Sequence, residues 1–243
     1  MSDSSRQKNE NRGWAIVTGG NRGLGFEACR QLGRKGFSVI LTARNEGQGR
    51  DAAQKLADEG LNVVFRALDV SRSESIDQFV RQLKSDGRKI DVLVNNAGIM
   101  FGSDEENDPS KDYRESLRET METNVYGPLE LSEKIAPYMN DGGHIINLSS
   151  GMGQLSDMGG GWHSYRISKA AINAVTRILA AELSDQGIKV NSVSPGWAKT
   201  DMGGESAPLS PEQGVQTIVW LATSPKDGPT ASFFDEDQDR MDW

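Results

Sequence analysis

Short apolar runs rich in β-branched residues alternate with longer amphipathic segments along most of the chain, and this alternation restricts the possible folds most strongly. Six runs are predicted to be strands, at residues 14–18, 37–42, 62–68, 90–95, 143–149 and 188–194. Segments with helical periodicity separate or follow them, at residues 23–35, 47–59, 73–86, 112–139, 164–186 and 211–222, and a further short strand is possible at 231–234. The strands are almost continuously apolar, as expected in a parallel sheet that is buried on both faces.

Strands that alternate with helices are joined by right-handed crossovers, which place helices on both faces of one sheet. The sequence therefore predicts an α/β fold, a doubly wound parallel sheet in three αβα layers (a Rossmann fold). We expect a single domain at 13–234, between a flexible N-terminal tail at 1–12 and an acidic C-terminal tail at 235–243. The segment 195–214, rich in Gly and Pro, is longer than an ordinary connection, and such loops often act as lids.

The composition excludes several kinds of partner. The net charge is −8, and the chain contains one cysteine, Cys29, and two histidines. Nucleic acids and anionic membranes require a basic surface, so neither is an expected partner. One cysteine allows no internal disulfide, which favours a cytoplasmic location, and these three residues do not make a zinc site. Cys29 is either a reactive thiol or, as we expect, a small buried residue of a helix.

The segment TGGNRGLG, residues 18–25, joins the first predicted strand to the first predicted helix. Gly19 permits a tight turn, Gly23 lets the backbone approach a pyrophosphate, and Gly25 lets helix and strand pack closely. The helix N-terminus then offers free N–H groups and a positive dipole to phosphates. A Gly-rich turn can also be purely structural, but its place between strand and helix favours a dinucleotide site.

Tyr165 and Lys169 lie four residues apart at the start of a long predicted helix. This spacing places both side chains on one helical face, about one turn apart. Free tyrosine ionises near pH ~10, and a lysine held close to it can stabilise the phenolate and lower that pKa. We therefore expect the pair to donate and accept a proton near neutral pH.

Several further motifs occur in a fixed order around this pair. Asn95-Asn96-Ala97-Gly98 follows the fourth strand, Thr123-Asn124-Val125 lies in the next helix, Leu148-Ser149-Ser150 ends the fifth strand, and Pro195-Gly196 follows the sixth. With T-G-x-x-x-G-x-G and Tyr165-x-x-x-Lys169, these motifs resemble those of the short-chain dehydrogenase/reductase family. The resemblance covers residues 13 to about 223.

The resemblance implies a role for each catalytic residue. Tyr165 would protonate the substrate carbonyl oxygen as hydride arrives from a nicotinamide, and Ser150 would hydrogen-bond the same oxygen. Lys169 would lower the pKa of Tyr165 and hold the nicotinamide ribose. Asn124 would help to anchor a water that supplies protons to Lys169.

The same resemblance assigns a cofactor site. Asp69 and Val70 would contact the adenine, the segment 96–98 would pass the adenine-side ribose, and residues 195–198 with Thr200 would pack against the nicotinamide half. The complete set is Gly19, Asn21, Arg22, Gly23, Leu24, Gly25, Arg44, Asp69, Val70, Asn96, Ala97, Gly98, Tyr165, Lys169, Pro195, Gly196, Trp197, Ala198 and Thr200. Ala198 stands where family members usually carry Val or Ile, so its contact with the carboxamide would be through the backbone.

The end of the second strand favours NADP(H) over NAD(H). An NAD site carries an acidic residue about twenty residues beyond the Gly-rich turn, to bind the ribose 2′-hydroxyl. Here the strand ends in Ala43-Arg44-Asn45. The guanidinium of Arg44 can grip a 2′-phosphate, and Arg22 can approach it from the other side. Glu46 is the competing feature, and we expect it to point into solvent.

Two loops are predicted to form an apolar substrate pocket. They carry Met152, Leu155, Trp162, Trp197 and Met202, and substrate contacts are predicted for Ser150, Met152, Trp162, Tyr165, Trp197 and Met202. Loop packing onto the core is the alternative for each. The segment PGWAKTDMGG and the short C-terminus resemble the carbonyl-reductase branch of the family, whose members reduce aldehydes, ketones and quinones. The spacing between Ser150 and Tyr165 is two residues longer than is common.

The leading hypothesis is an NADPH-dependent carbonyl reductase. A sugar-alcohol, steroid or acyl-thioester oxidoreductase is the alternative on the same fold. A protein that senses NADP(H) or serves as a scaffold without turnover is an alternative of another class, which the presence of all four catalytic residues argues against. The resemblance also implies that the two long helices pair subunits, so we expect a homodimer or homotetramer. The second of these helices has small and apolar residues that could pack closely on a partner: Ala170, Ala171, Ala174, Ile178 and Ala181. The alternative is a monomer in which this face packs only on its own sheet.

Overall fold

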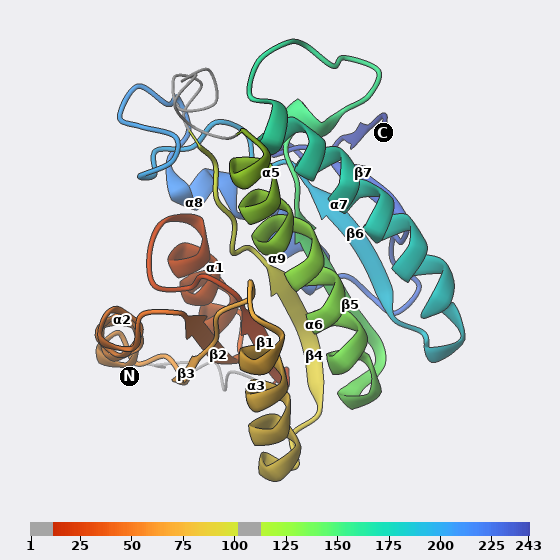
Figure 1. Cartoon of the computed structure of the whole chain (residues 1–243). Helices are drawn as coiled ribbons and strands as arrows, with labels where there is room; N and C mark the ends of the chain where they lie inside the picture. Colours follow the sequence, from red (N-terminus) through yellow and green to blue (C-terminus); the bar gives the residue numbers. More distant parts are fainter. Residues whose placement is uncertain (1–11, 102–112) are drawn as a thin grey trace, which may run out of the picture.

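The computed structural model describes residues 12–101 and 113–243. One eight-stranded sheet runs through it in the order β3-β2-β1-β4-β5-β6-β7-β8, and every neighbouring pair is parallel except β7 with β8. The strands are β1 (Trp14–Val17), β2 (Ser38–Ala43), β3 (Val63–Ala67), β4 (Ile90–Asn95), β5 (Met139–Leu148), β6 (Lys189–Val193), β7 (Ser232–Phe234) and β8 (Arg240–Met241). This arrangement confirms the predicted doubly wound α/β fold (Figure 1).

Helices cover both faces of the sheet. The helical elements are α1 (Gly23–Arg34), α2 (Glu46–Asp58), α3 (Ser73–Asp86), α5 (Tyr113–Met121), α6 (Gly127–Ile135), α7 (His163–Glu182), α8 (Pro211–Gly214) and α9 (Gln216–Ala222). Successive strand residues point to opposite faces, so alternate side chains feed two cores. Ile16 and Ile145 pack with α3, α6 and α7, whereas Val17 and Ile146 pack with α1, α2 and α9.

Three predicted helical segments differ from the structure. The helix expected at 112–139 is interrupted by a π-helical turn (Glu122–Tyr126), and it ends in a 3₁₀ turn (Ala136–Tyr138) because Pro137 cannot donate the next helical hydrogen bond. Residue 112 lies outside the described residues, and Met139 already begins β5. The segment 164–186 is α7 followed by a separate 3₁₀ turn (Ser184–Gln186), and 211–222 breaks at Val215 into α8 and α9.

The structure differs from the predicted acidic C-terminal tail at 235–243, because part of this segment pairs with the sheet. Arg240 and Met241 pair with β7, and the ring of Trp243 stacks on Phe233 with 5.9 Å between the centroids. The apolar side chains of Met241 and Trp243, which the acidic composition of this segment obscured, hold it on the domain. Of the N-terminal tail predicted at 1–12, residues 1–11 lie outside the described residues.

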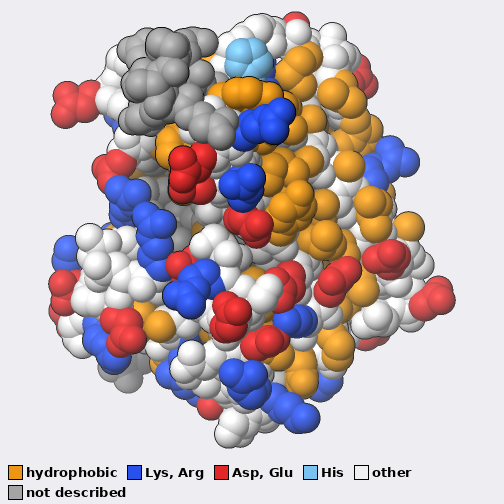
Figure 2. All heavy atoms as spheres, in the orientation of Figure 1, with side chains coloured by type: hydrophobic (Ala, Val, Ile, Leu, Met, Phe, Trp, Pro, Cys, Tyr) orange, Lys and Arg blue, Asp and Glu red, His pale blue; other side chains and the backbone are white. Residues whose placement is uncertain are grey.

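One face of the molecule exposes large apolar side chains. Tyr113, Tyr126, Ile167 and Ile178, which belong to α5, the π-helical turn and α7, are each about half exposed, between 48% and 57%. Figure 2 shows apolar side chains gathering along the side where these helices lie. None of the helices in the described ranges is both long and apolar enough to cross a membrane.

Candidate active site

A cavity of about 810 Å³ opens at the carboxyl ends of the parallel strands. It lies beyond β1 and β4, where the strand order changes direction, which is the usual ligand position in a doubly wound sheet. Every residue predicted to bind cofactor or substrate lines this cavity, and of the four predicted catalytic residues only Asn124 does not reach its surface. The structure therefore brings the predicted residues together, although their binding roles stay predictions.

The Gly-rich turn forms the floor at one end of the cavity. Gly19 adopts a φ of 64°, in the left-handed region that favours glycine. A Cβ on Gly25 would lie 2.3 Å from the carbonyl oxygen of Gly19, so only glycine lets α1 approach the turn this closely. This close contact agrees with the helix–strand packing predicted for Gly25.

Thr18 and Asn96 fix the turn against the end of β4. The hydroxyl oxygen of Thr18 accepts hydrogen bonds from the backbone N–H groups of Asn96 and Ala97, both at 2.9 Å. The Asn96 amide donates in return to the carbonyl oxygens of Thr18, at 2.7 Å, and Gly19, at 3.2 Å. The side chain of Asn96 thus holds the shape of the turn, a role that the sequence did not reveal.

Tyr165 and Lys169 lie at the other end of the cavity, on the first turns of α7. The ammonium nitrogen of Lys169 lies 5.3 Å from the Tyr165 ring centroid and donates a 2.8 Å hydrogen bond to the carbonyl oxygen of Leu148. Ser150, directly after β5, hydrogen-bonds the Tyr165 hydroxyl and accepts a bond from the backbone N–H of Met152 at 3.1 Å. The phenol and the Ser150 hydroxyl are therefore paired and face one ligand space.

The expected lowering of the Tyr165 pKa is not found. Burial raises the pKa of Tyr165 to about 12, and the hydrogen bond with Ser150 offsets only part of that rise. Burial also lowers the pKa of Lys169 to about 8. Removal from water disfavours both charged forms, and the Lys169 ammonium is directed at the Leu148 carbonyl. With its pKa raised in this way, the Tyr165 phenol keeps its proton at neutral pH.

Asn124 lies in the π-helical turn and binds protein groups. Its amide NH₂ donates to the carbonyl oxygen of Ile99 at 2.9 Å and to the Ser168 hydroxyl at 3.0 Å, and its oxygen accepts from the N–H of Ile99 at 2.9 Å. The Ser168 hydroxyl donates to the carbonyl oxygen of Tyr165 at 2.8 Å. Asn124 thus links the β4 loop to α7, and the predicted water at this residue stays a prediction.

The cavity continues into a smaller pocket of about 300 Å³ beside the end of β2. It is lined by Asn21, Arg22, Arg44, Asn45 and Gln48, and none of these described residues is acidic. Arg44 has no ion-pair partner among the described residues, so its guanidinium is available to an anion. Glu46 pairs with Arg50 at 2.8 Å on exposed helix surface, in agreement with its predicted orientation.

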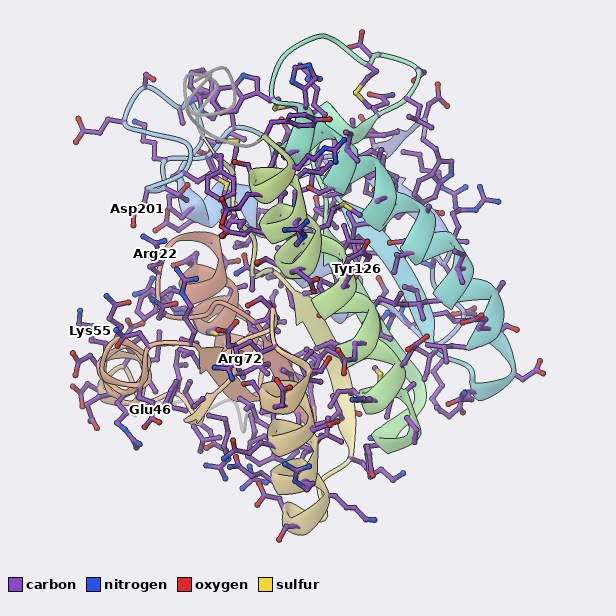
Figure 3. All side chains as sticks on the ribbon, viewed as in Figure 1. Arg22, Glu46, Lys55, Arg72, Tyr126 and Asp201 are labelled. Carbon is purple, nitrogen blue, oxygen red and sulfur yellow. The ribbon has the colours of Figure 1, made fainter. Side chains whose placement is uncertain are left out.

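Arg22 makes a contact that the sequence did not predict. Its guanidinium forms an ion pair with Asp201, and both side chains are exposed (Figure 3). Asp201 belongs to the loop that also carries Trp197, Thr200 and Met202, so this pair bridges the Gly-rich turn and the substrate loop. The only signal in the sequence was the position of Asp201 beside two predicted site residues.

The substrate end is lined by apolar loop side chains. Met152, Trp162, Trp197 and Met202 line the cavity as predicted. Leu155 is 67% exposed and does not line it, because it lies in the exposed part of its loop. Ile99 and Met100 also line the cavity, and their position directly after Asn95-Asn96-Ala97-Gly98 could have identified them. Cys29 is buried, as expected, and burial raises the pKa of its thiol.

Known proteins resemble this chain over almost its whole length. The family model described as short chain dehydrogenase matches residues 13–209. "Carbonyl reductase [NADPH] 1" of Bos taurus is 34% identical over 269 residues, covering 91% of this chain and 95% of that protein. "(+)-neomenthol dehydrogenase" of Arabidopsis thaliana is 31% identical, covering 93% of this chain and 96% of that protein.

Solved structures agree with the sequence comparisons. The carbonyl reductase Sniffer of D. melanogaster superposes with a TM-score of 0.84 at 30% identity, covering 96% of this chain and 100% of that one. An NADPH-bound carbonyl reductase from chicken fatty liver gives 0.83 at 29% identity, covering 94% and 98%. The order of the motifs, the fold and these similarities lead to one conclusion: the chain belongs to the short-chain dehydrogenase family.

Proposed function

We propose that the protein is an NADPH-dependent oxidoreductase that reduces the carbonyl group of an aldehyde, ketone or quinone to an alcohol. One observation carries this proposal: the Ser150–Tyr165–Lys169 group shares a continuous cavity with an arginine-bearing pocket in which none of the described lining residues is acidic. The printed names of the relatives, carbonyl reductase [NADPH] and neomenthol dehydrogenase, support the same reaction class.

The cavity fits a dinucleotide phosphate. The Gly-rich turn presents backbone where a side chain would block it, and α1 directs its N-terminus toward the cavity. Arg44 and Arg22 would hold the 2′-phosphate, and Asp69, Asn96 and Thr200 would border the rest of the cofactor. NADPH, when bound, supplies the hydride.

The chain itself supplies the proton and the polar contacts to the carbonyl oxygen. With a pKa raised to about 12, the Tyr165 phenol stays protonated at neutral pH and can donate its proton to the developing alkoxide. The Ser150 hydroxyl, paired with that phenol, hydrogen-bonds the same oxygen. Lys169, with a pKa lowered to about 8, keeps its proton at neutral pH and holds positive charge beside the phenolate as it forms.

The test is oxidation of NADPH, followed at 340 nm, with a panel of aldehydes, ketones, quinones, sugars, steroids and 3-oxoacyl thioesters. We expect turnover with apolar or aromatic carbonyls, because Met152, Trp162, Trp197 and Met202 line the substrate end. Preferential turnover of a sugar, steroid or thioester would show that this compound class, and not aldehydes, ketones or quinones, contains the substrate. Tight binding of NADPH without turnover of any of them would instead support the sensing role.

We also propose that the protein assembles as a homodimer or homotetramer, in the cytoplasm. Ala174, Ile178 and Ala181 are exposed on α7, so this face does not pack only on its own sheet. Tyr113 and Tyr126 expose further apolar surface beside it. Light scattering at micromolar concentration should give a multiple of 26.5 kDa, and a mass of one chain would contradict the assembly.

A further inference from the structure

The loop between Ser150 and Tyr165 carries two residues of the substrate end, Met152 and Trp162. Its middle, residues 155–160, is exposed, and it is followed closely by the start of α7 at His163. Gly159, Gly160 and Gly161 add conformational freedom just before Trp162. A loop of this composition needs contacts from outside itself to keep Met152 and Trp162 in place.

The first end of the loop is fixed by close packing. A Cβ on Gly153 would lie 2.5 Å from the backbone carbonyl carbon of Lys169, so the loop backbone rests directly on α7. The N–H of Gly151 donates to the Ser194 hydroxyl at 3.0 Å. Met152 therefore lies between two anchored glycines.

The second end has no comparable packing and contains a strained residue. Trp162 adopts φ 54° and ψ 41°, the left-handed region, and provides no side-chain cap for α7. A bulky residue in this region is strained and persists only where its surroundings impose the conformation. A Cβ on Gly160 or Gly161 would meet nothing within 4 Å, so these two glycines do not impose it through packing, whereas a Cβ on Gly159 would lie 3.2 Å from Nη2 of Arg166.

Arg166, one residue after Tyr165, connects the two ends. Its Nε donates to the carbonyl oxygen of Gly161 at 3.1 Å, and its Nη1 donates to the carbonyl oxygen of Met152 at 3.4 Å. No carboxylate in the described part of the chain forms an ion pair with it. A guanidinium offers several N–H donors in one rigid plane, so it can bridge two separate segments where a lysine ammonium offers one point.

We propose that Arg166 is a positioning residue that sets the shape of the substrate end by holding Met152 and Trp162 at a fixed separation. It does not line the cavity, so it acts through these two residues. The proposal rests on the proposed function for its kinetic consequence, but the contacts that define it do not depend on any ligand. Arg166 should govern how well a carbonyl substrate is bound and oriented, and it should affect proton donation by Tyr165 little.

The experiment compares Arg166→Met and Arg166→Lys with wild type, and uses Arg177→Met as the matched control. Arg177 lies on the same helix, but its guanidinium covers the ring of Trp243. The probes are 9,10-phenanthrenequinone and 4-nitrobenzaldehyde, with NADPH affinity measured by fluorescence. Amide hydrogen exchange of the peptide covering residues 151–164 reports on the loop without any substrate.

Arg166→Met should raise KM for the probes about tenfold, the size expected for losing hydrogen bonds from a charged donor, with a smaller change in kcat. The KM of Arg166→Lys for the probes should lie between that of Arg166→Met and that of wild type. Exchange in residues 151–164 should accelerate most in Arg166→Met, less in Arg166→Lys and not in Arg177→Met, and NADPH affinity should stay within about twofold in all variants.

The proposal is overturned if Arg166→Met leaves both KM and loop exchange unchanged, or if it lowers NADPH affinity and kcat together. If wild type reduces neither probe, the proposed function is in question, and the exchange measurement still decides whether Arg166 holds the loop.

Discussion

The two halves of the cavity are built in different ways. At the cofactor half, a Cβ on Gly25 would lie only 2.3 Å from the Gly19 carbonyl oxygen, so the backbone itself is closely packed. Thr18 and Asn96 exchange hydrogen bonds there, between the ends of neighbouring strands. At the substrate half, Gly160, Gly161 and Gly204 have open space around them, and the loop between Ser150 and Tyr165 rests on α7 at Gly153 and is bridged by the side chain of Arg166. The site for a common cofactor can thus be built from closely packed backbone. The side chains of a substrate pocket on loops, in contrast, can be replaced without disturbing the sheet.

The largest expected effect lies where the two halves meet. Tyr165→Phe should lower kcat about 10²- to 10⁴-fold, because the phenol is the proton donor to the carbonyl oxygen. NADPH affinity should be almost unchanged, since the lost hydroxyl acts mainly in the transition state. Single-turnover kinetics with NADPH in excess measures the chemical step. Retention of more than about a tenth of kcat would remove Tyr165 from this role.

Lys169, which lies beside Tyr165, should make the stability of the protein depend on pH. Its pKa is lowered to about 8 in the folded protein, whereas an unfolded lysine titrates near pH ~10.4. Between these values unfolded Lys169 binds more protons than folded Lys169, so the contribution of this residue to the free energy of unfolding should rise with pH by an amount on the order of 3 kcal/mol. Urea unfolding of wild type and Lys169→Met from pH 7.5 to 10 measures the difference between them. A constant difference would show that Lys169 is not desolvated.

A pair of glycine substitutions tests the contrast directly. Gly25→Ala should destabilise the protein by about 1–3 kcal/mol and weaken NADPH binding, because the methyl group overlaps the Gly19 carbonyl oxygen. Gly160→Ala, in the substrate half, should change neither the stability nor the NADPH affinity, because a Cβ at this position meets nothing within 4 Å. Thermal unfolding and NADPH titration measure both effects. Equal effects of the two substitutions would mean that the halves do not differ in rigidity.

The cofactor half should also determine the choice of nucleotide. Arg44→Asp should weaken NADPH binding about tenfold or more and improve the use of NADH, because a carboxylate repels the 2′-phosphate and can bind a 2′-hydroxyl. Lys55→Asp on the outer surface of α2 makes the same change of charge away from the cavity and serves as control (Figure 3). Equal affinity of the wild-type protein for NADH and NADPH would contradict this assignment.

The smallest effect is expected from the ion pair that bridges the halves. Arg22 and Asp201 are 68% and 72% exposed, and exposed pairs contribute little. Asp201→Asn should change NADPH affinity by no more than about fivefold, and by less as salt is added. Titrations at low and high ionic strength measure this. A larger, salt-independent effect would mean that the substrate loop takes part in holding the cofactor.

Much of the architecture was predictable, because the periodicity of apolar residues is a local property. The six main strands, the parallel sheet and the Gly-rich turn follow from runs such as 14–18 and 37–42 and from the glycines beside them. The π-helical turn at Asn124 was not predictable, because hydrogen bonds to Ile99 and Ser168 accompany it and these residues lie far away in the chain. The C-terminal pairing of β8 with β7 likewise depends on a long-range contact.

The sequence by itself determined the family, the order of the elements and the residues that gather at the cavity, because each depends on short motifs and local pattern. Only the tertiary structure decided the charge states of Tyr165 and Lys169, the pairing of Arg22 with Asp201 and the contacts of Arg166 with the loop. These properties depend on burial and on neighbours from distant segments. A spacing of four residues places a phenol beside an ammonium, but the solvent removed around them sets which form each prefers.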